Sequence, residues 1–391
     1  MKYNFDQFPA RRSTESIKWN AFPPDVLPMW VADMDFVSPA PVIQALRNRV
    51  EHGIFGYPQG IVPYGSVLPE LQQAVVAWLS GRYGWQVLPE DLMLVPGVVT
   101  GVNLACHALA TPGGGVVVET PVYTPILEAP KNAGMIRQGV ELVRLPDGSN
   151  GIDWDAFERA FTPETRLFIL CNPHNPLGRV FTAEELARMA DICLEHGVMM
   201  CSDEIHCDLT YSDSRHIPLA SLSPEIARNT ITLIAPSKTF NLAGLECSIA
   251  VIPDAELRKK YAQSGKGLAS WVNLMGQVAA QAAYSEGQEW LDQLLVYLED
   301  NRDFLMKFVQ QELPGVQMVQ PEATYLAWLD CRETEIENPY RFFLEKARVA
   351  CNDGKTFGQG GDGFVRLNFG CPRAMLAEAL ERMQQALLNN R

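Results

Sequence analysis

A lysine set among small residues is the first candidate for chemistry in this sequence. Lys238 follows the apolar, strand-like segment 231–234 and lies in the run APSKTFNLAG, which spans 235–244. A lysine at the end of a buried strand is partly withdrawn from water, which favours its neutral, nucleophilic form. Schiff-base chemistry requires that form. The alternative is a lysine at an ordinary strand terminus that points into solvent, and the motif taken alone leaves both interpretations open.

Three more polar side chains follow strand-like segments in the same way. Asp203 comes after 198–201, Asn175 after 167–170, and Tyr123 after 116–118. In open α/β sheets, ligands bind at the carboxyl ends of the strands. Each residue taken singly fits ordinary turn chemistry, because Asn-Pro and Pro-Leu-Gly are turn sequences. Together with Lys238 they predict one shared site at the edge of a sheet.

The segments that must position these residues alternate between strands and helices. Apolar runs without polar alternation indicate strands covered on both faces, and intervening helices indicate a mostly parallel order. We predict strands at 92–95, 116–118, 167–170, 198–201, 231–234 and 248–252, with helices at 99–110, 183–196 and 255–263. The predicted fold class is therefore α/β, with a large domain built on this sheet.

The C-terminal part has a different pattern and predicts a smaller α+β domain. We predict long helices at 272–286 and 289–313, strands at 325–329 and 364–367, and a terminal helix at 373–388. A helix near 275–300 is expected to bridge the two domains. The N-terminal segment is rich in proline and tryptophan and is expected to pack on the small domain or on a neighbouring subunit. The predicted boundaries are an arm over 1–48, a large domain over 49–280 and a small domain over 281–391.

The composition excludes several classes of protein. Of the 391 residues, 47% are hydrophobic and 20% are charged, which is unlike a disordered chain. The formal net charge of −14 argues against nucleic acid or an anionic membrane as a partner. No apolar run approaches the roughly 18 residues of a membrane span, and the N-terminus lacks the layout of a signal peptide. We therefore expect a cytoplasmic protein.

The nine cysteines are scattered and include no CxxC pair. This distribution favours reduced, buried thiols over disulfides or a zinc site, and no metal is predicted.

The order and spacing of Asn175, Asp203, Lys238 and Arg366 resemble those of the class I/II aminotransferase superfamily, which has fold type I and depends on pyridoxal 5′-phosphate (PLP). The resemblance covers almost the whole chain. It implies that Lys238 holds PLP as a Schiff base and later moves protons at the substrate Cα. Asp203 would pair with the ring nitrogen, Asn175 with the ring hydroxyl, and Tyr123 would stack on the ring. Arg366 would hold the substrate α-carboxylate, which its planar fork suits.

The resemblance also predicts where the phosphate and a second subunit lie. The run PGVVTG at 96–101 places a glycine turn between a strand and a helix, so the N–H groups of Val98 and Val99 are expected at the phosphate. Tyr57, in the run FGYP, resembles the tyrosine that dimers of this superfamily lend to the phosphate in the partner. This predicts a homodimer with a shared active site.

Three positions depart from the usual pattern of the superfamily. Ala235 stands where a serine is frequent and Glu246 where an arginine is frequent, so the phosphate lacks two usual partners. We expect Ser237 to compensate in part. His206 stands where a tyrosine is frequent. We expect it near the cofactor ring, the alternative being a histidine with a structural hydrogen bond.

Six segments resemble one branch of the superfamily, the MalY/PatB-type C–S lyases, also called cystathionine β-lyases of the aminotransferase fold. They are LPMWVADMDF (27–36), FGY (55–57), SDEIH (202–206), SKTFN (237–241), TYLAWLD (324–330) and VRLNFGCPR (365–373). The backbone around Ala32 would lie near the substrate carboxylate. The alternative for that segment is an N-terminal packing arm, and the two are compatible.

The implied activity is β-elimination from L-cystathionine or a related cysteine S-conjugate, which yields a thiol, pyruvate and ammonia. An aminotransferase for amino acids is the alternative enzyme, and it would require a keto-acid acceptor. A PLP-binding regulatory protein that acts through a protein partner is a third hypothesis.

Overall fold

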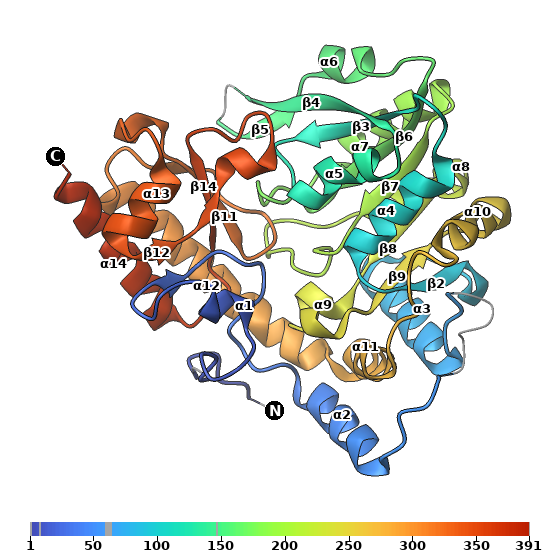
Figure 1. Ribbon diagram of the computed structural model, residues 1–391, viewed down its shortest axis with the longest axis horizontal. Coiled ribbons are helices and arrows are strands. Elements are labelled where there is room, and N and C mark those ends of the chain that lie inside the picture. Colours follow the sequence, from blue (N-terminus) through green and yellow to red (C-terminus); the bar gives the residue numbers. More distant parts are fainter. Residues whose placement is uncertain (1, 8, 59–64, 146–147, 391) are drawn as a thin grey trace.

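The computed structural model describes residues 2–7, 9–58, 65–145 and 148–390. Within these residues, an eight-stranded sheet has the order β2-β9-β8-β7-β6-β3-β4-β5 (Figure 1). Its strands are Leu92–Val95 (β2), Gly115–Thr120 (β3), Ile136–Arg144 (β4), Asn150–Ile152 (β5), Thr165–Cys171 (β6), Met199–Asp203 (β7), Thr230–Ile234 (β8) and Ser248–Val251 (β9). Strands β8, β7, β6, β3 and β4 are parallel, whereas β9 is antiparallel to both neighbours and β5 is antiparallel to β4. The predicted, mostly parallel sheet is confirmed.

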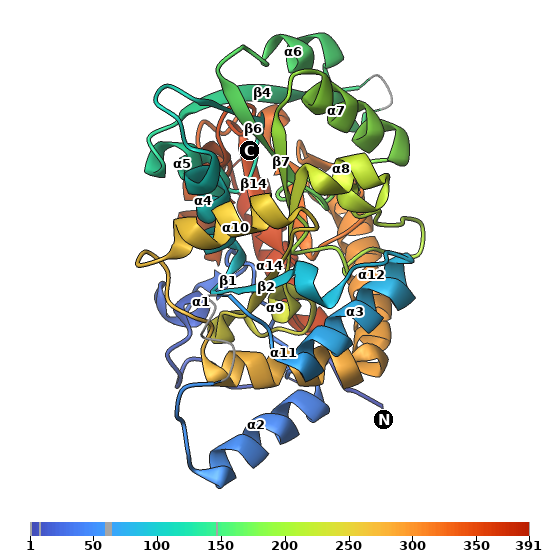
Figure 2. The ribbon, with the colours of Figure 1, turned by 90° about the vertical axis from the view of Figure 1, so that its right-hand side faces the viewer.

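Helices cover both faces of this sheet. Val116 and Val118 of β3 belong to the apolar cluster beneath α4, α5 and α10. Val117 points to the opposite face, because side chains alternate along a strand, and it packs with α6, α7 and α8. Figure 2 shows α4 and α10 on one side of the sheet and α7 and α8 on the other. These helices span Val98–Leu109 (α4), Thr124–Asn132 (α5), Trp154–Arg159 (α6), Ala183–Glu195 (α7), Pro224–Arg228 (α8) and Ala255–Gly265 (α10).

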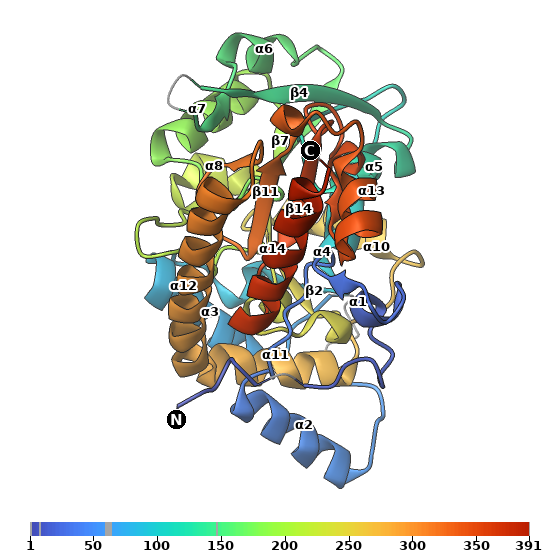
Figure 3. The same cartoon turned by 90° about the vertical axis from the view of Figure 1, so that its left-hand side faces the viewer.

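A second, antiparallel sheet forms the core of the C-terminal part. Its order is β10-β11-β14-β13, with bounds Gln317–Met318, Leu326–Asp330, Phe364–Asn368 and Asn352–Asp353. The long helices α12 (Gln288–Glu312) and α14 (Arg373–Leu388) pack side by side in Figure 3, with α13 (Pro339–Phe342) and a π-helical turn at Phe343–Ala347 nearby. The structure thus has the smaller α+β unit that the sequence predicts.

The region predicted to bridge the two units contains two helices, as the predicted ranges 272–286 and 289–313 imply. α11 (Leu274–Glu286) ends at Gly287, and α12 starts with the next residue. A Cβ on Gly287 would lie 2.4 Å from the Ala283 carbonyl oxygen and 2.5 Å from the Phe240 ring. Phe240 therefore packs directly against the glycine between the two helices. The predicted helices at 272–286 and 289–313 are confirmed, whereas the expected bridge near 275–300 spans both of them rather than one helix.

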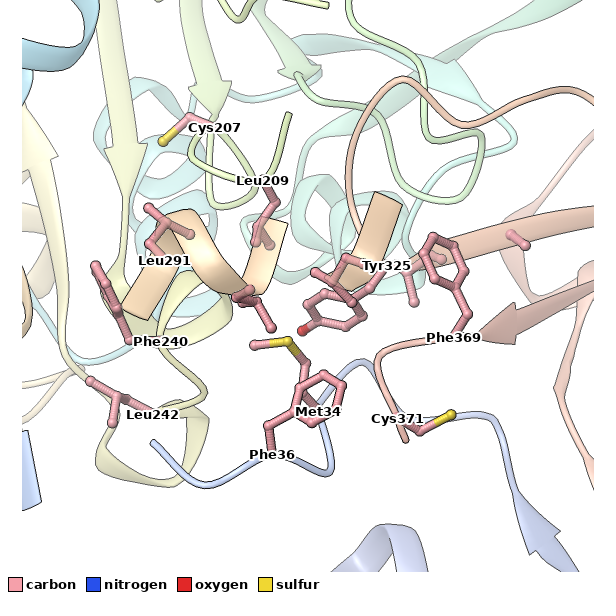
Figure 4. Packing of buried hydrophobic residues seen from close by; sticks show 14 of the residues in the cluster. Met34, Phe36, Cys207, Leu209, Phe240, Leu242, Leu291, Tyr325, Phe369 and Cys371 are labelled. Carbon is pink, nitrogen blue, oxygen red and sulfur yellow. The ribbon is translucent and has the colours of Figure 1, made fainter. Parts of the chain in front are cut away.

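The N-terminal segment contacts the small sheet region and the large unit. β1 (Leu27–Pro28) pairs in parallel with β12 (Val349–Ala350), and α1 (Ile17–Asn20) lies just before it. α2 (Ala40–His52) and α3 (Pro69–Tyr83) both pack on α11. Figure 4 shows Met34 and Phe36 among apolar side chains that include Tyr325 and Phe369. The boundaries at 48/49 and 280/281 stay predictions.

The nine cysteines are all buried free thiols. Within the described ranges, no helix combines the length and the apolar character needed to cross a membrane.

Candidate active site

A cavity of about 500 Å³ lies where the predicted strand ends meet the small sheet. Strands β8, β7, β6 and β3 are consecutive neighbours, so the residues that follow them reach one edge of the sheet. Lys238, Asp203, Asn175 and Tyr123 all line the cavity, which confirms their predicted proximity. Arg366 of β14 lines it as well, together with Ala32 of the N-terminal segment. All three parts of the chain therefore contribute to one site.

Lys238 lies on the short helix α9 (Pro236–Thr239), directly after β8. Its Nζ donates a hydrogen bond to the Ala32 carbonyl oxygen at 2.6 Å. Burial lowers the pKa of Lys238 to about 8, the Arg366 charge adds to this, and the carboxylates of Asp33 and Asp203 oppose it. A larger share of the amine is therefore neutral than in an exposed lysine, as the sequence predicts.

The turn that carries Lys238 is anchored by the next residue along the chain. Thr239 donates from Oγ1 to Oδ2 of the buried Asp208 at 2.9 Å. The Asp208 carboxylate also accepts hydrogen bonds from Trp78 and Tyr83 through Oδ1. Because Asp208 lies just beyond β7, this network ties the Lys238 turn to the segment that carries Asp203.

Asp203 is a buried carboxylate with a raised proton affinity. Its Oδ1 accepts a hydrogen bond from the Ile205 N–H at 3.1 Å. Burial raises the pKa of Asp203 to about 7, and the hydrogen bond from Ile205 opposes this. A cationic ligand group beside the carboxylate would relieve the cost of burying its charge.

His206 lies in the same cavity wall, and its ring meets Tyr325 edge-on at 6.1 Å. Burial keeps the pKa of His206 well below its ordinary range, so the imidazole is neutral. Its Nδ1 atom has no hydrogen-bond partner among the described residues. Nδ1 therefore makes no structural hydrogen bond within the described residues, which was the alternative role predicted for His206.

Arg366 is a buried cation held by neutral oxygen atoms. Nη1 donates to Asn175 Oδ1 at 2.9 Å, and Nη2 donates to the Trp30 carbonyl oxygen at 3.0 Å and to Asn352 Oδ1 at 2.6 Å. The guanidinium carbon lies 5.0 Å from the centre of the Phe357 ring. Burial lowers the pKa of Arg366 to about 10, which still leaves it charged at neutral pH. In the described part of the chain it forms no ion pair, so it is suited to bind an anion.

The start of α4, which lines the cavity, has the geometry of an anion site. Gly97 has φ of 89° and precedes α4, whose start has no side-chain cap. The N–H groups of Val98 and Val99 therefore remain free of helical partners and carry the positive end of the helix dipole. Both residues line the cavity.

Other polar side chains line the cavity and are candidates to bind the phosphate in place of the serine and arginine that are frequent at positions 235 and 246. Ser237 lines the cavity as predicted, and so do Thr100 and Ser248, which the sequence did not indicate. Glu246 also lines it, in a left-handed conformation with φ of 47°. Among the described residues, no arginine other than Arg366 lines the cavity, so none replaces the arginine that is frequent at position 246.

Residues 30–32 form another part of the wall, and side chains from two other regions hold the backbone of the segment 31–33. Asn368 donates through Nδ2 to the carbonyl oxygens of Val31 and Asp33. Tyr325 donates through its hydroxyl to the Ala32 carbonyl oxygen at 3.0 Å, the same atom that Lys238 contacts. Asn368 and Tyr325 were not predicted as site residues, although both lie in segments that carry the family resemblance.

Tyr57 does not reach this cavity. It is 81% exposed and packs edge-on against Trp271, with ring centres 5.4 Å apart. Its predicted contact with the phosphate of a partner subunit stays a prediction.

The residues present fit PLP. The cavity offers an amine for Schiff-base formation, a buried carboxylate that forms no ion pair within the described ranges, and helix N–H groups for a phosphate. Two buried nitrogen atoms of cavity residues, His206 Nδ1 and Arg366 Nε, also lack hydrogen-bond partners among the described residues.

Comparison with known proteins agrees with this geometry. The sequence model for aminotransferase class I and II matches residues 32–383. The chain belongs to this family. Among its members, it is similar to the cystathionine beta-lyase PatB of Bacillus subtilis (strain 168), with 42% identity over 98% of this chain and 100% of that protein.

Two solved structures of similar proteins contain the cofactor. Cystalysin from Treponema denticola, described with pyridoxal 5′-phosphate, is 31% identical with a TM-score of 0.95 and covers 100% of both chains. The PLP-bound C–S lyase from Staphylococcus hominis is 34% identical with a TM-score of 0.92, over 99% of this chain and 100% of that one. The family resemblance predicted from the sequence is confirmed.

Proposed function

We propose that this chain is a PLP-dependent carbon–sulfur β-lyase that cleaves L-cystathionine or related cysteine S-conjugates. The observation that carries the proposal is the pairing, in one cavity, of the Lys238 amine with the buried Arg366 cation. This pair suits an α-amino acid, because the guanidinium can bind the carboxylate while the amine acts at Cα. The sulfur leaving group is inferred from relatives, of which PatB is named a cystathionine beta-lyase.

When bound, PLP supplies an electron sink that stabilises negative charge at Cα. Asp203 would hold the ring nitrogen, Asn175 the ring hydroxyl, and Tyr123 the ring face. His206 would lie near the ring hydroxyl. Ser237 and the N–H groups of Val98 and Val99 would hold the phosphate.

Lys238 carries the proton chemistry. Its Nζ is the attachment point for PLP and, once released by the substrate, removes the Cα proton. With a pKa of about 8, about a tenth of the free amine is neutral at pH 7, against roughly one part in three thousand for an ordinary lysine.

The bonds broken are Cα–H and Cβ–S, and the thiolate leaves with the electron pair of the C–S bond and then takes up a proton. The released 2-aminoacrylate hydrolyses in water to pyruvate and ammonia. From L-cystathionine the thiol product is homocysteine.

An aminotransferase acting on amino acids is the second candidate, and the aminotransferase family match favours it as the alternative. Both activities begin with the same proton removal at Cα. They differ in their need for an acceptor, because a transaminase turns over only with a keto acid.

The test measures thiol and pyruvate from the purified, PLP-loaded protein and L-cystathionine. A lyase releases both in equal amounts over many turnovers with no keto acid added. No thiol release, with glutamate formed from the amino group of cystathionine only when 2-oxoglutarate is added, would assign the chain to the aminotransferases instead.

We further propose a homodimer with a shared active site. Exposed apolar side chains support it: Val50, Ile54, Phe55 and Tyr57 lie close together along the chain, and Tyr57 packs against the exposed Trp271, three residues after the exposed Leu268. Exposed apolar side chains gathered in this way mark protein–protein contact sites. In this dimer, Tyr57 contacts the phosphate of the PLP bound in the partner subunit.

Mixed dimers test the shared site. Tyr57→Ala and Lys238→Ala proteins should each have low activity, and after mixing and subunit exchange the hybrid should regain activity in one of its two sites. No recovery in a confirmed hybrid would refute the sharing of Tyr57. The cytoplasmic location and the possible protein partner stay predictions of the sequence.

A further inference from the structure

The hydrogen bonds of Arg366 are distributed unevenly over its guanidinium. An arginine has five N–H groups, two on each Nη and one on Nε. Nη2 uses both of its groups, on the Trp30 carbonyl oxygen and on Asn352 Oδ1. Nη1 donates to Asn175, while the buried Nε has no partner among the described residues.

This distribution limits how a carboxylate can bind. Two-point binding of a carboxylate uses two neighbouring N–H groups on one edge of the guanidinium, either Nη1 with Nη2 or Nε with Nη2. Both edges need an N–H of Nη2. Since both of these are taken, a carboxylate must displace either the Trp30 carbonyl or the Asn352 side chain.

The Trp30 carbonyl is the less movable of the two acceptors. It belongs to the backbone just after β1, where the preceding residue Met29 bonds to Ala350 and to Asn368 through its own N–H and C=O groups. Asn352 is half-buried on β13, lies opposite Arg366 in the strand register, and lines the cavity. Its amide turns away by rotation about side-chain bonds alone.

We propose that Asn352 is a specificity-determining residue that competes with the substrate carboxylate for Arg366. In the free enzyme its Oδ1 satisfies one N–H of a buried cation, and the arriving carboxylate takes over that N–H. Asn352 thereby sets how strongly the site prefers an α-amino acid over a simple amine. This inference rests on the proposed function, because it requires a substrate with an α-carboxylate.

Two substitutions at this position have opposite expected effects. Asn352→Ala removes the competitor, so amino acids should bind about fivefold more tightly, the size of one modest hydrogen bond. Asn352→Asp gives Arg366 a charged competitor, so amino acids should bind at least about tenfold more weakly. A residue with a merely structural role would weaken binding in both variants.

The test uses the PLP-loaded protein and two probes that differ only in the carboxylate. 2-Aminoisobutyrate lacks a hydrogen on Cα and therefore binds without turnover, and isopropylamine is the same molecule with hydrogen in place of the carboxylate. Dissociation constants come from the absorbance change of the bound cofactor. Asn338→Asp is the matched charge control, because Asn338 caps α13 through its side chain and aspartate caps equally well.

The expected result is a lower dissociation constant for 2-aminoisobutyrate with Asn352→Ala, a higher one with Asn352→Asp, and no change in either variant for isopropylamine. Weaker or unchanged binding of 2-aminoisobutyrate by Asn352→Ala overturns the competitor role. Asn352→Ser, whose side chain is too short to reach, serves if the alanine variant folds poorly by circular dichroism. If the wild type itself does not prefer 2-aminoisobutyrate over isopropylamine, the amino-acid substrate of the proposed function fails instead.

Discussion

Replacing Lys238 with methionine should stabilise the cofactor-free protein at pH 7. Burial lowers the pKa of Lys238 to about 8 from an ordinary value of 10.5, a difference of about 2.5 pH units. At about 1.4 kcal/mol per pH unit, the protonated amine costs the fold about 3 kcal/mol at pH 7. The hydrogen bond to Ala32 offsets about 1 kcal/mol of this. The expected net gain for Lys238→Met is therefore about 2 kcal/mol.

The sign of the pH dependence follows from proton binding. Between pH 8 and 10.5 the unfolded chain binds more protons at Lys238 than the folded chain does, so the stability of the wild type rises with pH there. The penalty is fully present below pH 8 and disappears above 10.5. The advantage of Lys238→Met should therefore shrink by about 2 kcal/mol between pH 7 and pH 9.5.

The difference in the free energy of unfolding between wild type and Lys238→Met is measured by urea unfolding of the cofactor-free proteins at pH 7 and pH 9.5, at one protein concentration. Lys18→Met is the control, because Lys18 is fully buried and, unlike Lys238, its Nζ pairs with a carboxylate, that of Asp35, at 2.7 Å. Removing one partner of such a buried pair should destabilise the protein by about 3–5 kcal/mol. A Lys238→Met protein that is less stable than wild type at pH 7, or whose advantage does not change with pH, would refute the reasoning.

Three further substitutions test other parts of the site. Asp203→Asn removes the buried carboxylate, so PLP should dissociate at least about tenfold more readily in equilibrium dialysis; unchanged retention would contradict its assigned role. A Cβ added at Gly97 would meet no atom within 4 Å, but the alanine in Gly97→Ala must adopt φ near 89°. The resulting strain of about 1–3 kcal/mol should weaken phosphate binding, which is measured as PLP affinity. Equal affinity would mean that this turn does not hold the phosphate. Asn368→Ala leaves the carbonyls of Val31 and Asp33 without their donor, so the melting temperature and kcat/KM should both fall. A normal kcat/KM would show that the segment holds its position without Asn368.

The sequence was sufficient to predict the central strands, because buried strands appear as uninterrupted apolar runs. β4 was missed since its exposed and half-buried positions carry Arg137, Gln138 and Glu141 and give no apolar run. The antiparallel β5 and the two-residue strands β1, β10, β12 and β13 are too short to leave a pattern. The helices α11 and α12 were predicted close to their observed bounds, whereas the packing of Phe240 on Gly287 joins distant parts of the chain and leaves no local pattern.

The candidate site likewise contains residues that the sequence predicted and residues that it did not. Lys238 and Asp203 were predicted because parallel strands bring their carboxyl ends to one edge, which is a rule of topology. Asn352 was missed because its place in the wall depends on how the small sheet meets the large one, and Ser248 because β9 runs antiparallel to β8, which brings its first residue to the cavity edge. Such contacts join segments far apart in the chain and leave no local signature.

The most direct test of the account is pyruvate formation from L-cystathionine by wild type and Lys238→Ala, with and without added ethylamine and with no keto acid. The account predicts sustained pyruvate release by the wild type and a loss of roughly a hundred- to ten-thousand-fold in the variant. Ethylamine, which replaces the missing base, should restore part of the loss. Turnover by Lys238→Ala at the wild-type rate without amine would contradict the central claim that this lysine moves the Cα proton.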